Sequence, residues 1–293
     1  MSTYSCNASL ENTGSTGCAE KLNGMIGFVW TPPGFSFEAE SNFQTLADWI
    51  TAIKQTDNRI YVFPEFLEVE AQDEETQYQT FGSGAQIKNR EGKPGIKGTM
   101  DVATCVSAKL RGFNGQKGRI FIFYESGVIL GTSSDGVKVQ GLTLNNLEVE
   151  KRPMTDNATL SLSKVMLRLN DATEKEDRPV TCLPTSWSFA DLYGLLDVDI
   201  VASSPTVAGL VIDVTVECSG DPLVGLVKTD VIIKDSAGAT KEVTTLTDNT
   251  GGNYTVALTL TAGDYTVTLA SAATLSIEGY ESSGEVSFTV PAG

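Results

Sequence analysis

The chain has 293 residues, enough for one large or two ordinary domains, and 41% of them are hydrophobic, which suffices for a packed core. Its formal net charge of −16 argues against nucleic acid as a bound target, because phosphate binding needs clustered Lys and Arg. The absence of histidine excludes Ser-His-Asp and Cys-His catalysis and imidazole metal sites, so we expect a protein that is not an enzyme.

Residues 1–24 are rich in Ser, Thr, Asn and Gly, which predicts an N-terminal arm. They have neither the basic start nor the apolar run of a signal peptide. No stretch of the chain approaches the about 20 apolar residues of a membrane span. We therefore expect the chain to fold in a cytosol and to have no membrane partner.

The five cysteines are Cys6, Cys18, Cys105, Cys182 and Cys218. Their odd number and wide spacing, with no CxxC pair, favour reduced thiols over a disulfide scaffold or a zinc site. A bridge between Cys6 and Cys18 is compatible with the sequence but is not required by it.

The clearest helix is predicted over residues 41–56, after a short strand at 27–30. Ser41 is a candidate N-cap, and Gln44 follows it at the spacing of a capping box. The apolar stripe that should pack on a sheet consists of Phe43, Leu46, Ile50 and Ile53, with Trp49 beside them.

Strands are predicted at residues 59–63 and 66–70, and the segment that follows, 71–100, is long, polar and rich in glycine. A segment of this kind in a compact domain is usually functional or mobile. It is compatible with an extended hairpin that becomes ordered on a neighbouring subunit, or with a solvated loop.

Short strands with frequent turns follow, which is typical of a sandwich or barrel. We predict strands at residues 100–110, 119–124, 128–130, 137–149 and 160–169, a charged turn at 171–178, a short helix at 187–196 and a strand at 198–201. Leu142, Leu144, Leu147 and Val149 can share one face only if a bulge lies near Asn145 and Asn146, where the parity of the alternation changes.

Residues 202–206, Ala-Ser-Ser-Pro-Thr, are predicted to be a linker. They divide the chain into an N-terminal arm (1–24), a β domain with one packed helix (25–202) and a smaller domain (203–293). Eleven acidic residues and three lysines lie from residue 202 onward, and 26 acidic and 18 basic residues before it, so each part has a charge of −8. Strands in the smaller domain are predicted at 211–216, 230–234, 240–245, 254–260, 265–270 and 285–290, as in an immunoglobulin-like sandwich.

Two glycine-rich segments lack the spacing of known binding loops. Residues 112–118 are not a phosphate-binding loop and precede a strand, which predicts a hairpin turn. Residues 248–252 lack the EF-hand pattern, which predicts a turn without calcium. No pair of carboxylates stands out for glycoside hydrolysis. We therefore assign no catalytic, cofactor-binding or metal residue.

The order of the predicted parts resembles that of the tail tube proteins of long-tailed bacteriophages. Those proteins pack a β-sandwich with a helix into hexameric rings, and many have an immunoglobulin-like domain on the outside. Residues 132–139, which lead into the strand up to Glu150, are similar to the late strands of that fold. Gly252-Asn253-Tyr254-Thr255-Val256 and Gly263-Asp264-Tyr265-Thr266-Val267 are similar to strands of phage and bacterial immunoglobulin-like domains.

The resemblance implies a virion structural protein, assembled in the host cytoplasm into stacked rings that conduct DNA without binding it specifically. Its partners would be further copies of itself and other virion proteins. The resemblance carries over no functional residue. Two alternatives stay open: another virion part, such as a head decoration or tail-tip subunit, and a bacterial surface adhesin, against which the missing signal peptide counts.

A channel for DNA should be lined with carboxylates, because repulsion keeps phosphates from binding to its wall. Screening at physiological salt limits this effect to about 8 Å, so the carboxylates must lie close to the path. Candidates on the polar faces of the predicted strands are Glu68, Glu70, Glu148 and Glu150.

Overall fold

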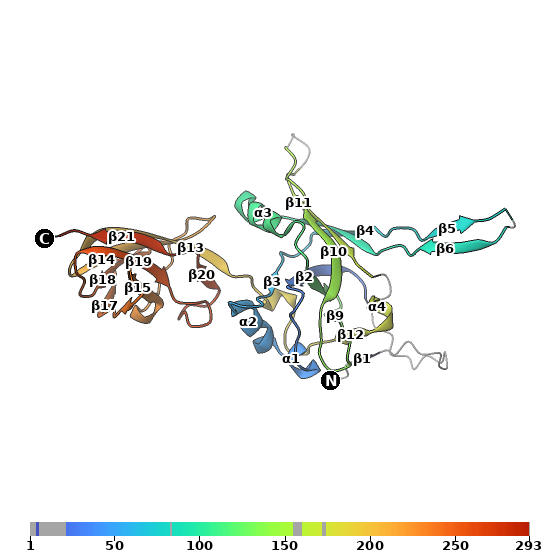
Figure 1. Cartoon of the computed structure of the whole chain (residues 1–293), viewed down its shortest axis with the longest axis horizontal. Helices are drawn as coiled ribbons and strands as arrows, with labels where there is room; N and C mark the ends of the chain where they lie inside the picture. The colour runs from blue at the N-terminus through green and yellow to red at the C-terminus, as the bar shows by residue number, and fades with distance from the viewer. Residues whose placement is uncertain (1–3, 6–21, 83, 155–159, 172–173, 293) are drawn as a thin grey trace. The chain divides into compact units, whose positions relative to one another are not determined.

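The computed structural model describes residues 4–5, 22–82, 84–154, 160–171 and 174–292 (Figure 1). The chain is mainly β with only short helices, which confirms the predicted fold class. It divides into an N-terminal unit, residues 1–53 and 57–192, and a C-terminal unit, residues 54–56 and 193–293. Among the described residues, no helix has the length and apolar character that crossing a bilayer requires.

The predicted linker at 202–206 is wrong, because these residues belong to a strand. Strand β13 (Leu196–Thr206) pairs with β14 (Gly209–Val216), and Ser203 lies opposite Val211. A register shift follows Ser203, and Ser204 has a φ of 50°. Small polar residues suit this irregular hairpin end as well as they suit a linker, so composition alone places the boundary too late. The division falls at 192–193 instead of 202–203.

A ten-stranded sheet forms the framework of the N-terminal unit. Its main order is β1-β12-β9-β8-β10-β11-β7-β4, with β2 beside β8 and β3 beside β2. The short strand β1 lies within the predicted N-terminal arm (1–24) and pairs with β12. Residues 6–21 lie outside the described part of the chain. The strands are β1 (Tyr4–Ser5), β2 (Met25–Thr31), β3 (Tyr61–Val62), β4 (Glu68–Ala71), β7 (Gly95–Met100), β8 (Arg119–Tyr124), β9 (Ile129–Thr132), β10 (Leu142–Val149), β11 (Ser163–Leu169) and β12 (Pro179–Cys182).

The helix predicted at 41–56 is two helices, α1 (Glu40–Phe43) and α2 (Leu46–Lys54). Trp49 gives the physical reason for the break. Its indole Nε1 donates to the carbonyl of Phe43 at 2.8 Å, so that oxygen accepts from a side chain instead of continuing the helix. Ser41 lies inside α1 and is not the N-cap, which is Ala39.

The predicted apolar stripe is buried in part: Phe43, Ile53 and the adjacent Trp49 are buried, whereas Leu46 and Ile50 are half-buried. Trp49 is fully buried, and its ring lies 5.1 Å from Phe121 and 5.4 Å from Phe123 of β8, measured between centroids. Phe43 is also fully buried, 5.4 Å from Phe121. Aromatic pairs at these separations add to the free energy of burial.

Two further elements differ from the prediction. Strand β7 ends at Met100, and residues 104–110 form helix α3 (Thr104–Leu110), followed by a 3-10 turn η1 (Arg111–Phe113). Val102, Thr104 and Val106 occur at every second position, which is the pattern of a strand. Ser107 and Leu110 are both buried and lie one helical turn apart, which favours the helix. Within the predicted helix at 187–196 only η2 (Phe189–Asp191) is helical.

The predicted bulge in β10 is confirmed. Leu144 lies opposite Leu169 of β11, and the next pair is Asn146 with Arg168. The shift of one residue lets Leu142 and Leu144 before it, and Leu147 and Val149 after it, all face the core.

The C-terminal unit is a sandwich of two sheets around one core. The first sheet has the order β17-β18-β14-β13-β20, and the second β16-β15-β19-β21. In the letters of the immunoglobulin fold, β13, β14, β18 and β17 are strands A, B, E and D of the first sheet, and β15, β19 and β21 are strands C, F and G of the second. This is the ABED and CFG arrangement of an immunoglobulin-like fold, as predicted. The strands other than β13 and β14 are β15 (Val231–Asp235), β16 (Thr240–Lys241), β17 (Thr245–Asp248), β18 (Asn253–Ala257), β19 (Gly263–Leu269), β20 (Tyr280–Ser282) and β21 (Val286–Val290).

Candidate functional site

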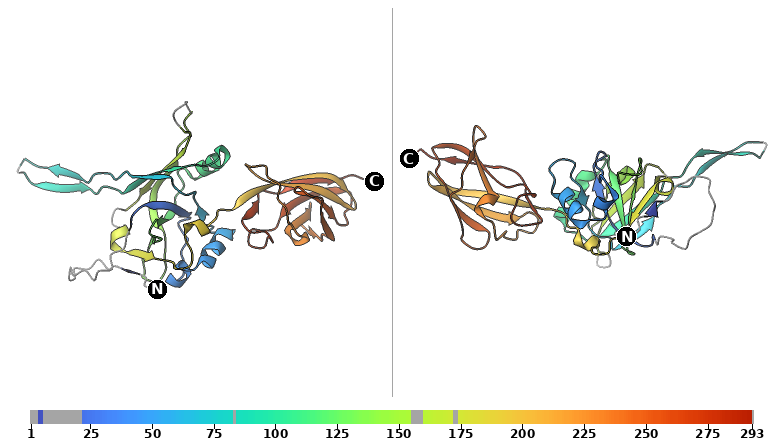
Figure 2. Two further views of the ribbon diagram at one scale, coloured as in Figure 1. Left: turned by 180° about the vertical axis from the view of Figure 1, so that it is seen from behind. Right: turned by 90° about the horizontal axis from the view of Figure 1, so that it is seen from below.

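The polar segment at 71–100 forms a projecting hairpin, which we call the arm and define as residues 72–94. Its strands β5 (Gln77–Thr80) and β6 (Gln86–Arg90) pair only with each other in the described part of the chain, and every residue of both is exposed. Figures 1 and 2 show the arm continuing β4 and β7 beyond the sheet. Of the two interpretations left open by the sequence, the extended hairpin is the one that the structure adopts.

Backbone contacts fix the base of the arm. Gln72 donates to the carbonyl of Gly95 at 2.8 Å, and Glu74 donates to that of Lys93 at 3.0 Å. Gly92 passes so close to the other strand that a Cβ there would lie 1.8 Å from the carbonyl oxygen of Glu74. Only glycine permits this approach, so the base is tightly closed.

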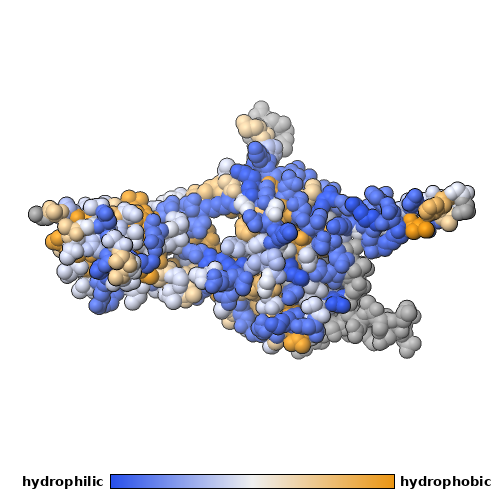
Figure 3. Space-filling view, in the orientation of Figure 1, coloured by the Kyte–Doolittle hydropathy of each residue, from blue (hydrophilic) through white to orange (hydrophobic). Residues whose placement is uncertain are grey.

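The outer part of the arm exposes apolar side chains. Tyr78 and Ile87 are each 59% exposed and Phe81 is 44% exposed, and Figure 3 shows apolar colouring near the end of the arm. Tyr78 pairs with Lys88 while Ile87 pairs with Gln79, so Tyr78 and Ile87 point to opposite faces of the ribbon. The arm therefore offers apolar contacts on both sides.

The four candidate carboxylates lie on one sheet face. In β4, Glu68 and Glu70 pair with Thr99 and Lys97 of β7, on the face opposite to the core. In β10, Glu148 shares this face, and the backbone of Glu150 donates to Lys164 at 2.8 Å. The structure thus brings together residues that are about 80 positions apart in the sequence.

Basic residues on the two strands between them offset this charge. Lys164 and Arg168 of β11 and Lys97 of β7 alternate with core residues and point the same way as the glutamates. Lys97 Nζ lies 3.6 Å from a carboxylate oxygen of Glu150. With Glu74, which pairs with Arg168, five acids lie beside three bases, so this face has a net charge of about −2 in one subunit and is less acidic than the sequence predicted for a channel wall.

A polar cleft of about 380 Å³ lies where β8, β9 and β10 approach the short helix α4 (Glu174–Asp177). The sequence predicted only a charged turn at 171–178. The cleft is lined by Arg119, Thr132, Ser133, Ser134, Gln140, Thr143, Asn170, Asp171, Glu174 and Arg178.

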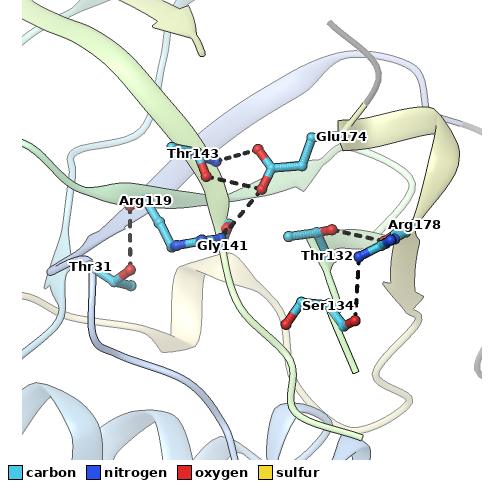
Figure 4. Close-up of polar contacts among 8 residues, drawn as sticks. All are labelled: Thr31, Arg119, Thr132, Ser134, Gly141, Thr143, Glu174 and Arg178. Atoms are coloured by element: carbon cyan, nitrogen blue, oxygen red, sulfur yellow. Dashed lines mark hydrogen bonds and ion pairs between the residues drawn. The ribbon is translucent and has the colours of Figure 1, made fainter. Parts of the chain in front are cut away.

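Within this cleft the carboxylate of Glu174 is hydrogen-bonded to Thr143 and Arg119 (Figure 4). Its carboxylate accepts from the Thr143 backbone at 2.7 Å and from the Thr143 hydroxyl at 3.0 Å. Arg119 donates to it at 3.3 Å and to the carbonyl of Gly141 at 3.0 Å. These contacts attach α4 to the sheet, which is a structural role.

The remaining sequence predictions concern turns and thiols. Residues 248–252 form the predicted turn, closed by the Thr250 backbone donating to the carboxylate of Asp248 at 2.7 Å. Residues 112–113 lie in η1 and residues 114–118 connect it to β8, so this segment is not a hairpin turn between strands.

Cys182 is a free thiol, but Cys105 and Cys218 are not, so the expectation of reduced thiols is wrong for these two. Cys6 and Cys18 lie outside the described residues. Burial raises the pKa of Cys182 to about 11, which keeps its thiol protonated and unreactive at neutral pH.

The chain matches no protein-family model and no curated protein.

Proposed function

We propose that the chain is a virion structural protein that assembles into stacked rings, the tail tube of a long-tailed bacteriophage, with its immunoglobulin-like unit outward. The single observation that carries self-assembly is the arm. A bare two-stranded ribbon is marginally stable in water, and this one exposes Tyr78, Phe81 and Ile87. Contact with a neighbouring copy would bury these side chains and complete the arm.

The open edge of the sheet supports the same proposal. Strand β4 ends the sheet and pairs on one side only, with β7, in the described part of the chain. Unpaired edges invite pairing with another chain, and closure into a ring satisfies them without open-ended aggregation. The next subunit of a ring would supply the missing strand.

The C-terminal unit supports the choice of a virion protein. It is a complete sandwich with its own core of 21 buried residues. Such a unit can be attached to a tube without contributing to its wall, as the resemblance to phage tail proteins implies.

The conduit part of the proposal depends on the sheet face that bears Glu68, Glu70, Glu148 and Glu150. Two of its three bases have carboxylate partners, since Lys97 pairs with Glu150 and Arg168 with Glu74. Paired bases attract phosphates less than free ones. A face of this composition would let DNA pass without a specific binding site.

Electron microscopy of the purified full-length protein tests the proposal. We expect long tubes of stacked rings with a central channel. Isolated monomers at high concentration would favour a head decoration or tail-tip subunit. Binding of purified monomers to host cells without any assembly would favour an adhesin.

A further inference from the structure

We infer that Glu74 is a positioning residue that fixes the direction of the arm relative to the sheet, and that this direction decides whether the arm reaches a neighbouring copy. The inference rests on the proposed function, because it assumes that the arm makes the contact between copies. It concerns how that contact is prepared within one subunit.

The geometry places Glu74 between two arginines from different parts of the fold. One carboxylate oxygen lies 2.6 Å from a guanidinium nitrogen of Arg90, which ends β6 in the arm. The other oxygen accepts from Arg168 of β11, in the body of the sheet. A single carboxylate thus joins the arm to the sheet across 94 positions of sequence.

Glu74 and Arg168 are less exposed than the side chains of the arm around them. The side chains of Glu74 and Arg168 are 29% and 32% exposed, whereas Arg90 is 54% exposed. Charge-assisted hydrogen bonds are stronger and more directional than neutral ones, and partial burial protects them from screening. These ion pairs are therefore suited to fixing the angle between the arm and the sheet.

Further hydrogen bonds near Glu74 restrain the base of the arm. Asp73 accepts from the Gly95 backbone at 3.0 Å, and Thr76 accepts from the Gly92 backbone at 3.2 Å. Lys93 donates to Asn170, the residue that follows β11, at 3.4 Å. Each contact restrains the base, and the Glu74 carboxylate in addition joins Arg90, farther out on the arm, to Arg168 of the sheet.

A small change of the angle between the arm and the sheet produces a large displacement of the tip of the arm. A ribbon of about nine residues extends for about 30 Å, so a tilt of about 10° at its base moves the tip by about 5 Å. A displacement of that size would take Phe81 and Ile87 out of contact with any fixed pocket on a neighbour. Assembly would then need a higher protein concentration.

The test compares Glu74→Ala and the conservative variant Glu74→Asp with a matched control, Glu91→Ala. Glu91 pairs with Lys88 at 2.7 Å on the same arm, and among the described residues it has no ion pair with the sheet. Two spin labels, one at Gln79 and one at an exposed sheet position such as Glu148, report the distance from tip to body. Sedimentation velocity reports assembly of the same full-length proteins.

For Glu74→Ala we expect a broadened tip-to-body distance distribution and an about tenfold rise in the concentration that assembles, equivalent to about 1.4 kcal/mol. Glu74→Asp should recover part of both effects, and Glu91→Ala should change neither. Unchanged distances and assembly in Glu74→Ala would overturn the inference.

A variant with residues 77–90 replaced by Asn-Gly separates this inference from the proposed function. If that variant assembles normally, the arm has no role between copies and the proposed function loses its main support. If it fails to assemble while Glu74→Ala assembles normally, only the positioning role of Glu74 is wrong.

Discussion

The hydroxyl of Tyr265, at the start of β19, closes onto the backbone of Thr261 four residues earlier. It donates to the carbonyl of Thr261 and accepts from its amide, both at 3.1 Å. This is the tyrosine corner of immunoglobulin-like sandwiches. It stabilises the connection through which the chain passes from one sheet to the other.

Tyr265→Phe should destabilise the C-terminal unit by about 1–2 kcal/mol, because both backbone groups of Thr261 lose their partner. Denaturant unfolding of the full chain, followed by a probe in the C-terminal unit, measures the change. Tyr78→Phe, which alters an exposed hydroxyl in the arm, is the control and should be neutral. Equal stability of the two variants would show that the corner contributes nothing.

Phe121→Ala should destabilise the N-terminal unit by about 3–5 kcal/mol, because it leaves a cavity among large rings. Phe121 is fully buried, and Phe37, Phe43 and Trp49 surround it. The loss should appear as a lower denaturation midpoint with the C-terminal transition unchanged. A loss below about 1 kcal/mol would contradict the packing of α1 and α2 on β8.

Limited proteolysis should cut near residues 192–195 and spare 202–206. The first segment lies at the division between the units, whereas the second is hydrogen-bonded to β14. Mass spectrometry of the early fragments identifies the site. Preferential cleavage after residue 202 would restore the linker that the sequence predicted.

Alkylation of Cys182 should be about a hundredfold slower than that of an ordinary thiol at pH 8, since its pKa is raised from 9.0 to about 11 and few thiolates form. The neutral form is favoured in the folded state, so this contribution to stability is present below pH 9 and is lost between about pH 9 and 11. Mass spectrometry of alkylated peptides, with and without denaturant, measures the rate. Fast alkylation of the folded protein would show that β12 is open.

The sequence predicts the β class, the sandwich at the C-terminus and the bulge near Asn145 because these follow from alternation, which is a local pattern. It misses the break between α1 and α2 because the indole of Trp49 removes a carbonyl from the helix. It misplaces the boundary because Ala202 and Ser203 have the composition of a linker but pair with Ile212 and Val211 of β14.

The candidate site shows the same division. That residues 71–100 are unusual is evident from their polarity. The bridge from Glu74 to Arg90 and Arg168 is not, because it joins side chains that only the folded sheet brings together. The pairing of Lys97 with Glu150 likewise depends on register across three strands.

Sedimentation velocity of the wild-type chain, beside the variant with residues 77–90 replaced by Asn-Gly, tests whether the arm drives self-assembly. We predict large, fast-sedimenting assemblies for the wild type and a folded monomer for the variant, with matching circular dichroism. A wild type that stays monomeric at all concentrations, or a variant that assembles equally well, would contradict it.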